Sequence, residues 1–255
     1  MIYAMIQARM GSSRLPGKVM KEVVGKPLLE HIINRLQSCE KIDKIIVITS
    51  EEIENEPIKQ LCKEINIDCF AGDEKDVLDR YYKAAIEFNL NENDSVLRIT
   101  ADCPLIDPEI VDAVIEKHLD EDYDYTTNTL IRTFPDGLDC EVFKLSILNE
   151  MWNDARLKSE REHVTLYIKN NPENYKLGNF KQNEDYSNLR WTVDEKEDFI
   201  LIKKVYEHLY DDEKIFLMKD ILQLLDDNPS LLEINDMYER NEGLQKSLDN
   251  DELIR

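Results

Sequence analysis

The 255-residue sequence predicts a single α/β domain built on a doubly wound, mostly parallel sheet. Two observations lead to this fold class. Short apolar runs rich in β-branched residues, of which Ile2–Ile6 and Lys44–Thr49 are the clearest, alternate with segments whose apolar residues recur at helical spacing. The runs also lack polar alternation, which is typical of strands that helices cover on both faces. The chain therefore has the order expected of repeated strand–helix units.

The same spacing assigns the remaining elements. We expect helices over Pro27–Leu36, Ile58–Ile65 and Val77–Phe88. We expect further strands near Cys69 and over Ser95–Thr100 and Leu189–Asp194. Residues 134–181 lie outside this alternation, so we expect them to form a small β/α arm on the single domain. The polar tail from Asn228 to Arg255 is expected to pack loosely or fray.

Composition and charge exclude several classes of protein. Asp and Glu outnumber Lys and Arg by 54 to 32, and the formal net charge of -22 disfavours binding to nucleic acid or to acidic membranes. No segment approaches the ~18 consecutive apolar residues that span a membrane, and the N-terminus lacks a signal-peptide pattern, so we expect a cytoplasmic protein. The five cysteines are scattered without a Cys-x-x-Cys pair, and we expect them to be reduced.

The loop Gln7–Lys18 follows the first predicted strand and combines small residues with three cations, Arg9, Arg14 and Lys18. In an open α/β sheet, ligands bind at the carboxyl ends of the strands, where small residues let backbone N–H groups approach an anion. Each charged phosphate oxygen that leaves water needs a charge-assisted partner, so this loop suits a triphosphate. The alternative is an ordinary strand-to-helix turn with solvated basic side chains.

This loop matches neither the Walker pattern nor the three spaced glycines of a dinucleotide fold. It resembles the signature Gln/Pro-Ala-Arg-x-Gly-Ser-x-Arg-Leu-Pro-x-Lys of the cytidylyltransferases, which activate sugar acids such as sialic acid and KDO as CMP esters. Nearly the whole chain resembles the branch called spore coat polysaccharide biosynthesis protein F. The resemblance implies one nucleotidyltransferase domain over residues 1–255, with the Rossmann-like fold of nucleotide-diphospho-sugar transferases. It also implies that the nucleotide contacts Ala8, Arg9, Gly11, Ser12, Ser13, Arg14 and Lys18.

Two acidic residues are expected to hold a magnesium ion. Asp102 follows the predicted strand Ser95–Thr100, at the same edge of the sheet as the loop, and Mg²⁺ is bound by one or two carboxylates plus substrate phosphates. The segment around Asp102 resembles the family motif Gly/Ala-Asp-x-Pro-Leu-Ile, whose Asp binds metal. Asp194 resembles the first Asp of the motif Val/Ile-Asp-x-x-x-Asp-Phe/Leu, although an N-cap is its alternative role. Asp107 is expected to cap a helix.

Two further residues resemble a family element that lies beside the nucleotide. The segment from Ala71 to Arg80 is similar to Arg/Ala-Gly-x-x-x-Asp-Val-Leu-x-Arg. Its Asp76 stands where a helix N-cap is expected, and capping alone accounts for that residue. Arg80 either faces phosphate or lies on the surface, and its position in the sequence does not separate these alternatives.

The acceptor pocket is predicted from two later segments. Asp139 and Glu141 alternate on one strand face, and carboxylates accept hydrogen bonds from sugar hydroxyls, although such pairs are commonly solvated. Their segment resembles the Tyr/Phe-Pro-x-Gly-Leu-Asp-x-Glu-Val-Phe element of the spore coat branch. Arg161 and His163 lie in an Arg-Glu-His-Val-Thr run that this branch shares, near a helix start predicted at Ser159 by a capping-box pattern. Arg161 is the better candidate for an acidic sugar group.

These residues predict a magnesium-dependent cytidylyltransferase that joins CTP to a sugar or sugar acid, releases pyrophosphate and serves surface or spore coat polysaccharide biosynthesis. Arg9, Arg14 and Lys18 would stabilise the departing pyrophosphate. By resemblance, residues 134–181 are a possible substrate or dimerisation arm, so a homodimer is a possible state. The alternatives are a glycosyltransferase of the same nucleotide-sugar fold and a regulatory nucleotide-binding module without turnover.

Overall fold

The computed structural model describes residues 1–238, 240 and 242–254, and it is organised around one seven-stranded sheet. Within this sheet, the strand pairs are parallel except those made by the fifth strand in the spatial order, which runs opposite to both neighbours. The predicted fold class is confirmed. In spatial order the strands are β5 (Asp68–Gly72), β4 (Lys44–Ser50), β1 (Ile2–Gln7), β6 (Ser95–Thr100), β8 (Glu141–Lys144), β7 (Tyr125–Thr127) and β9 (Leu177–Asn179).

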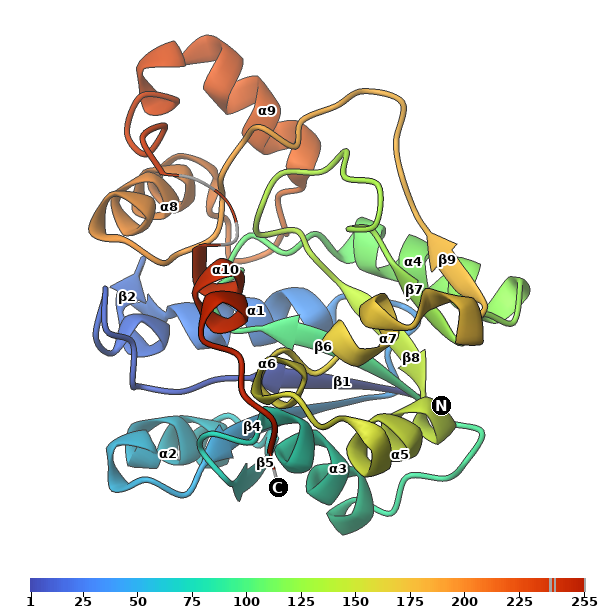
Figure 1. Cartoon of the computed structure of the whole chain (residues 1–255). Helices are drawn as coiled ribbons and strands as arrows, with labels where there is room; N and C mark the ends of the chain where they lie inside the picture. Colours follow the sequence, from blue (N-terminus) through green and yellow to red (C-terminus); the bar gives the residue numbers. More distant parts are fainter. Residues whose placement is uncertain (239, 241, 255) are drawn as a thin grey trace.

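Helices cover both faces of this sheet (Figure 1). One face packs against α1 (Leu28–Gln37), α2 (Glu56–Glu64) and α4 (Pro108–Asp120). The opposite face packs against α3 (Val77–Glu87) and α5 (Leu145–Asp154). Side chains of β1 alternate between the two cores, because successive residues of a strand point to opposite faces. The first core receives Ile2, Ala4 and Ile6, and the second receives Tyr3 and Met5.

A third apolar core joins α8 (Lys196–Leu209) and α9 (Met218–Asp227) to the outer side of α1. Two buried polar side chains fix this layer. Arg35 of α1 donates to the carbonyls of Ile106 and Phe216, at 2.5 and 2.7 Å. Asp107 caps α4 through the amide of Glu109 and also accepts from the amide of Met218 at 2.6 Å. The predicted capping role of Asp107 is therefore confirmed, and the same side chain holds the start of α9.

The strand predicted over Leu189–Asp194 is wrong. This segment is extended but makes only an isolated bridge, between Asp136 and Arg190. It passes so close to Gly137, whose φ is 104°, that a Cβ there would lie 2.6 Å from the backbone nitrogen of Thr192. The amide of Val193 then bonds the carbonyl of Asp102 at 2.8 Å. The backbone of Leu189–Asp194 pairs with loops and not with a neighbouring strand, which accounts for its strand-like residue pattern.

Residues 134–181 contribute to the sheet itself and do not form an arm outside the core. They contain β8 and β9 together with the short helices α6 (Lys158–His163) and α7 (Leu166–Asn170). The start of α6 also differs from the capping box expected at Ser159, because Glu160 accepts from the amides of Arg156 and Leu157. A role of this segment toward a second subunit stays a prediction.

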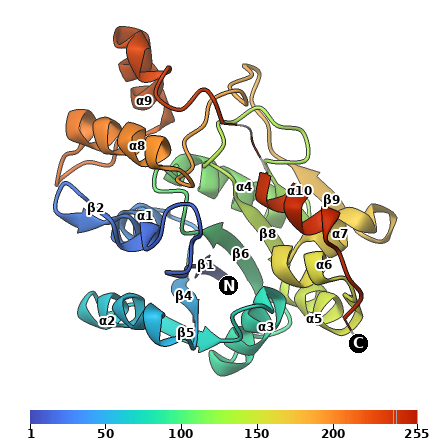
Figure 2. The same ribbon diagram turned by 60° about the vertical axis from the view of Figure 1, so that its left-hand side comes forward.

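The described part of the C-terminal tail contains a helix, and most of its residues from 243 to 254 are exposed, in agreement with the expected loose packing. Figures 1 and 2 both show α10 (Glu242–Asp249) lying against α6, at the edge of the sheet where β1 and β6 end. The remaining short elements are β2 (Glu22–Val23), β3 (Lys26–Pro27), η1 (Lys18–Met20), η2 (Ile53–Asn55), η3 (Pro172–Asn174) and η4 (Pro229–Leu231). None of the helices in the described ranges has the length and apolar character needed to cross a bilayer.

Candidate functional site

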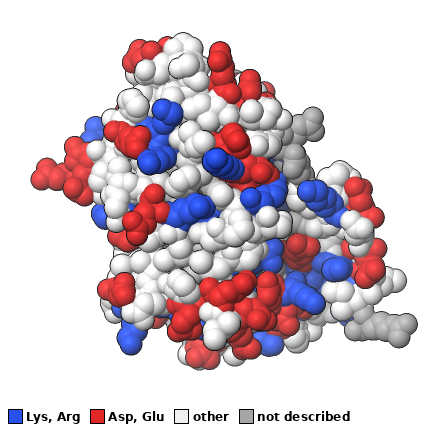
Figure 3. All heavy atoms as spheres, turned by 90° about the vertical axis from the view of Figure 1, so that its left-hand side faces the viewer, with Lys and Arg blue, Asp and Glu red and all other residues white. Residues whose placement is uncertain are grey.

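A cavity of about 560 Å³ opens at the carboxyl ends of β1 and β6. The loop after β1 forms one side of it, and residues after β6, from β8 and from the segment joining α6 to α7 form the others. Sequence analysis placed the functional residues at this edge of the sheet, and the structure brings most of them to one cavity. On the face drawn in Figure 3, Lys and Arg side chains lie interspersed with Asp and Glu.

The loop Gln7–Lys18 is held in a closed shape by its own backbone and by side chains from outside it. The amide of Gly17, whose φ is 66°, bonds the carbonyl of Met10 at 3.0 Å, and Asn55 accepts from the amide of Met10 at 2.7 Å. The Ser12 hydroxyl accepts from the amide of Leu15 at 3.3 Å. The predicted nucleotide-binding residues Ala8, Arg9, Gly11, Ser12, Ser13, Arg14 and Lys18 all line the cavity.

The ammonium group of Lys18 lies between the two predicted metal ligands. Its Nζ is 2.9 Å from Asp194, 3.3 Å from Asp102 and 2.7 Å from the carbonyl of Val193. Burial opposes the charge of Lys18, but the two carboxylates outweigh it and raise the pKa of Lys18. Arg14 adds a second cation, 3.1 Å from Asp194. The two carboxylates that we predicted to bind metal therefore converge on one point, which the Lys18 ammonium group occupies in this structure.

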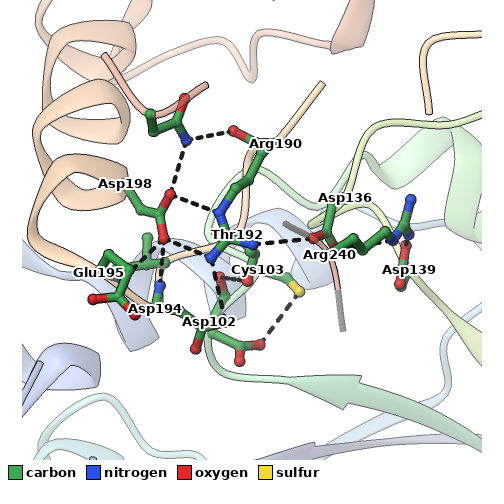
Figure 4. A network of polar contacts seen from close by, with 12 residues as sticks. Asp102, Cys103, Asp136, Asp139, Arg190, Thr192, Asp194, Glu195, Asp198 and Arg240 are labelled. Atoms are coloured by element: carbon green, nitrogen blue, oxygen red, sulfur yellow. Dashed lines mark hydrogen bonds and ion pairs between the residues drawn. The ribbon is translucent and has the colours of Figure 1, made fainter. Parts of the chain in front are cut away.

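The position of Asp194 depends on a buried ion pair that sequence analysis missed (Figure 4). Asp198 is fully buried and receives two hydrogen bonds from Arg190, at 2.9 and 2.8 Å. Its carboxylate also accepts from the amides of Asp194 and Glu195, at 3.0 and 2.9 Å. Glu195 is therefore the N-cap of α8, Asp198 completes its capping box from within the first turn, and Asp194 does not cap the helix. The available signal was an acid in the first turn of a predicted helix, three residues after Glu195.

The donor set at Asp102 and Asp194 fits a magnesium ion that a substrate helps to hold. No group of three or more His, Cys, Asp and Glu side chains in the described part of the chain is arranged to bind a metal alone. Mg²⁺ needs fewer protein ligands, because it takes one or two carboxylates and completes its shell with phosphate oxygens and water. Both carboxylates lie within 3.3 Å of the same Lys18 nitrogen, so they are close enough to share one ion.

Glu141 lies on the side of the cavity opposite the loop, and both of its carboxylate oxygens already accept hydrogen bonds. It accepts from Tyr125, Thr165 and Lys169, at 2.5, 2.8 and 2.7 Å, and from Arg98. Burial raises its pKa, but Lys169 and Arg98 outweigh burial and lower the pKa of Glu141 overall. Glu141 is therefore an ionised anchor that holds cations at the cavity wall. Its predicted bond to a sugar hydroxyl would need one of these contacts to open.

His163 and Asp139 also line the cavity, as predicted. The Nε2 atom of His163 is buried without a partner among the described residues, and burial lowers the pKa of this imidazole. Asp139 lies 2.5 Å from Arg240, which also approaches Asp136 at 3.3 Å. Burial raises the pKa of Asp136 to about 6, with Asp139 adding to this shift and Arg240 opposing it.

Three predicted residues do not line the cavity: Asp76, Arg80 and Arg161. Asp76 caps α3, as expected, and its carboxylate is bound by Arg161 at 2.6 to 3.0 Å. Arg80 donates to the carbonyls of Asp73 and Glu74, at 3.0 and 2.9 Å. These contacts hold the loop between β5 and α3, which lies beside the cavity because Glu74 is 3.7 Å from Arg9. In this structure the three residues shape the neighbourhood of the site and do not face into it.

Comparisons with known proteins agree with this geometry. A model of the family described as cytidylyltransferase matches residues 3–246. An uncharacterized protein of Methanocaldococcus jannaschii is 36% identical over 92% of this chain and 94% of its own. The spore coat polysaccharide biosynthesis protein SpsF of Bacillus subtilis is 32% identical over 89% of this chain and 95% of its own. A cytidylyltransferase structure from Leptospira borgpetersenii superposes with a TM-score of 0.86 at 32% identity, covering 93% and 99% of the two chains.

We expect Asp198→Asn to destabilise the protein strongly. The neutral amide would leave Arg190 buried without its full counter-charge, and breaking a buried ion pair from one side typically costs about 3–5 kcal/mol. The free energy of unfolding, measured by urea denaturation, tests this. Asp227→Asn is the matched control, because Asp227 is an exposed helix residue bonded only to Gln223 in the described contacts. Equal stability of the two variants would contradict the role given to Asp198.

Proposed function

The chain belongs to the cytidylyltransferase family, and on that premise we propose that it transfers CMP from CTP to a hydroxyl of a sugar or sugar acid and releases pyrophosphate. One observation supports this proposal above all. A single cavity is lined by the cationic loop Gln7–Lys18, by the convergent carboxylates of Asp102 and Asp194, and by a polar side suited to an acceptor. The likeness to a spore coat polysaccharide protein supports a role in making a surface polysaccharide.

The loop side of the cavity suits the triphosphate. Arg9, Arg14 and Lys18 all line it, together with the small residues that leave backbone amides accessible. Charge-assisted hydrogen bonds are shorter and stronger than neutral ones, so these cations are suited to oxygens that gain charge as pyrophosphate departs. In a chain with a net charge of -22, such a local group of cations is what allows a polyanion to bind.

Asp102 and Asp194 are the residues that would hold Mg²⁺. When bound, the ion would neutralise phosphate charge during the transfer. The protein's own contribution is to keep the two acids together. Lys18 lowers the pKa of Asp102 against the effect of burial, and Asp198 holds the backbone of Asp194.

The opposite side of the cavity suits an acceptor with an anionic group. Arg98, Arg132, His163 and Lys169 line it, and Glu141 fixes two of these cations. In the proposed reaction the acceptor hydroxyl attacks the α-phosphorus in line. The new oxygen–phosphorus bond forms as the bond to the β-phosphate oxygen breaks, the hydroxyl proton leaves to solvent, and pyrophosphate departs. This chemistry needs positioning and charge neutralisation, and it needs no nucleophilic side chain.

We expect CTP with Mg²⁺ to stabilise the protein and to yield pyrophosphate when a sugar acid such as KDO is present. A ligand at about 100 times its dissociation constant adds about 2.7 kcal/mol to the free energy of unfolding, which a thermal shift detects. ATP, GTP and UTP are the matched controls. Stabilisation by one of these nucleotides and not by CTP would contradict the proposal. Binding of CTP without release of its pyrophosphate in the presence of any sugar acid would favour a regulatory module.

We expect Asp102→Asn and Asp194→Asn each to abolish most magnesium-dependent turnover, since a neutral amide holds Mg²⁺ poorly. The double variant should be hardly slower than either single one, because residues that act as a unit are non-additive. Pyrophosphate release and melting curves for the three variants test this. Asp185→Asn, at an exposed turn, is the control. Additive losses of stability with turnover preserved would contradict the metal site.

A further inference from the structure

The C-terminal residues 240 and 242–254, which we call the strap, lie at the acceptor side of the cavity and are bound to the rest of the protein at both ends. At the first end, Arg240 bridges Asp136 and Asp139, at 3.3 and 2.5 Å. Figure 4 shows this guanidinium reaching the two acids from one side of the network that contains Asp102 and Asp194. The side chain of Arg240 is only 14% exposed, so the contact is largely shielded from solvent.

The second end of the strap is bound to α6 and to the residues just before it. Asp251 accepts from the amide and the hydroxyl of Ser159, at 2.9 and 2.6 Å. The amide of Ile254 bonds the carbonyl of Arg156 at 2.7 Å. Between the ends, Ser247 donates to Glu162 at 3.0 Å. The family match ends at residue 246, so the contacts of Ser247, Asp251 and Ile254 lie outside the part of the chain that the family model describes.

The middle of the strap forms part of the cavity wall. Gly243 and Leu244 line the same cavity as His163, which α6 carries. Figures 1 and 2 agree that α10 lies beside α6. A Cβ added at Gly243 would meet no atom within 4 Å, so this position faces open space.

The strap also changes the charge of the acceptor side. Asp136 and Asp139 both line the cavity, and two carboxylates there would repel an anionic acceptor. Arg240 offsets both of them, and burial together with Asp139 raises the pKa of Asp136. The strap therefore supplies the cavity with both a wall and a counter-charge.

We propose that the strap is a specificity element for the acceptor, and that the absence of a side chain at Gly243 leaves room for the part of a sugar acid remote from its reacting hydroxyl. This inference rests on the proposed function and deepens it. An acceptor extending toward α10 would lie between the strap and the cations of β6 and α7. A side chain at position 243 would occupy that room and leave the nucleotide side unchanged.

The test compares Gly243→Leu with Gln245→Leu. Gln245 is exposed on the same helix and does not line the cavity, so it receives the same side chain outside the acceptor side. With sugar acids of increasing chain length, KDO among them, we expect Gly243→Leu to raise KM for the longer acceptors by about tenfold or more, the scale on which a pocket discriminates by size. The KM for CTP should be unchanged, and Gln245→Leu should match the wild type. Equal effects on CTP and acceptor, or no effect on either, would overturn the proposal.

Calorimetric titration of KDO separates a failure of this inference from a failure of the proposed function. If the wild type releases no pyrophosphate, the proposed reaction is wrong, but binding of the sugar acid still tests the strap. We then expect weaker binding to Gly243→Leu than to the wild type and to Gln245→Leu. Equal binding to all three, or no binding to the wild type, would overturn the proposal. Matching melting temperatures of the two variants would show that the comparison concerns the cavity and not folding.

Discussion

The contact of the Lys18 ammonium with Asp102 and Asp194 is the interaction on which the site depends. Two carboxylates that face one another in a partly buried cavity repel, and one of them would take up a proton unless a cation stood between them. Lys18 supplies that cation and at the same time ties the loop after β1 to the end of β6 and to the segment before α8. One side chain thus joins three parts of the chain at the sheet edge where ligands bind.

Further ion pairs extend this arrangement through the molecule. The ion pair between Arg190 and Asp198 connects Asp194 to α8. Arg240 forms ion pairs with Asp136 and Asp139 and so connects them to the strap, and Asp136 also pairs with Arg190. Acidic and basic side chains consequently alternate around the cavity, in a protein whose net charge is strongly negative. An incoming polyanion meets cations that are already oriented by acids, which lowers the reorganisation needed when charge develops in a reaction.

Sequence reasoning succeeded where the signal is local and failed where it depends on partners distant in the chain. The apolar runs and helical spacing predicted the parallel core, and the loop from Gln7 was correctly placed at the cavity. The strand expected at Leu189–Asp194 is an extended loop, because an isolated residue pattern does not reveal whether its neighbours are strands. The roles of Asp198 and Arg240 were missed, since each depends on tertiary contacts. The tail from Asn228 was expected to pack loosely or fray because its composition is polar; its last residues are mostly exposed, and polar side chains bind them to α6.

A double-mutant cycle of Lys18→Met and Asp194→Asn tests the central claim most directly. The free energies of unfolding of the wild type, both single variants and the double variant would be measured by urea denaturation at neutral pH. If Lys18 holds the two carboxylates together, Lys18→Met alone leaves them in mutual repulsion, and adding Asp194→Asn relieves part of the loss. The expected coupling is about 1–3 kcal/mol, typical of residues in one charged network. Losses that add to within about 0.5 kcal/mol would show independent side chains and contradict the account.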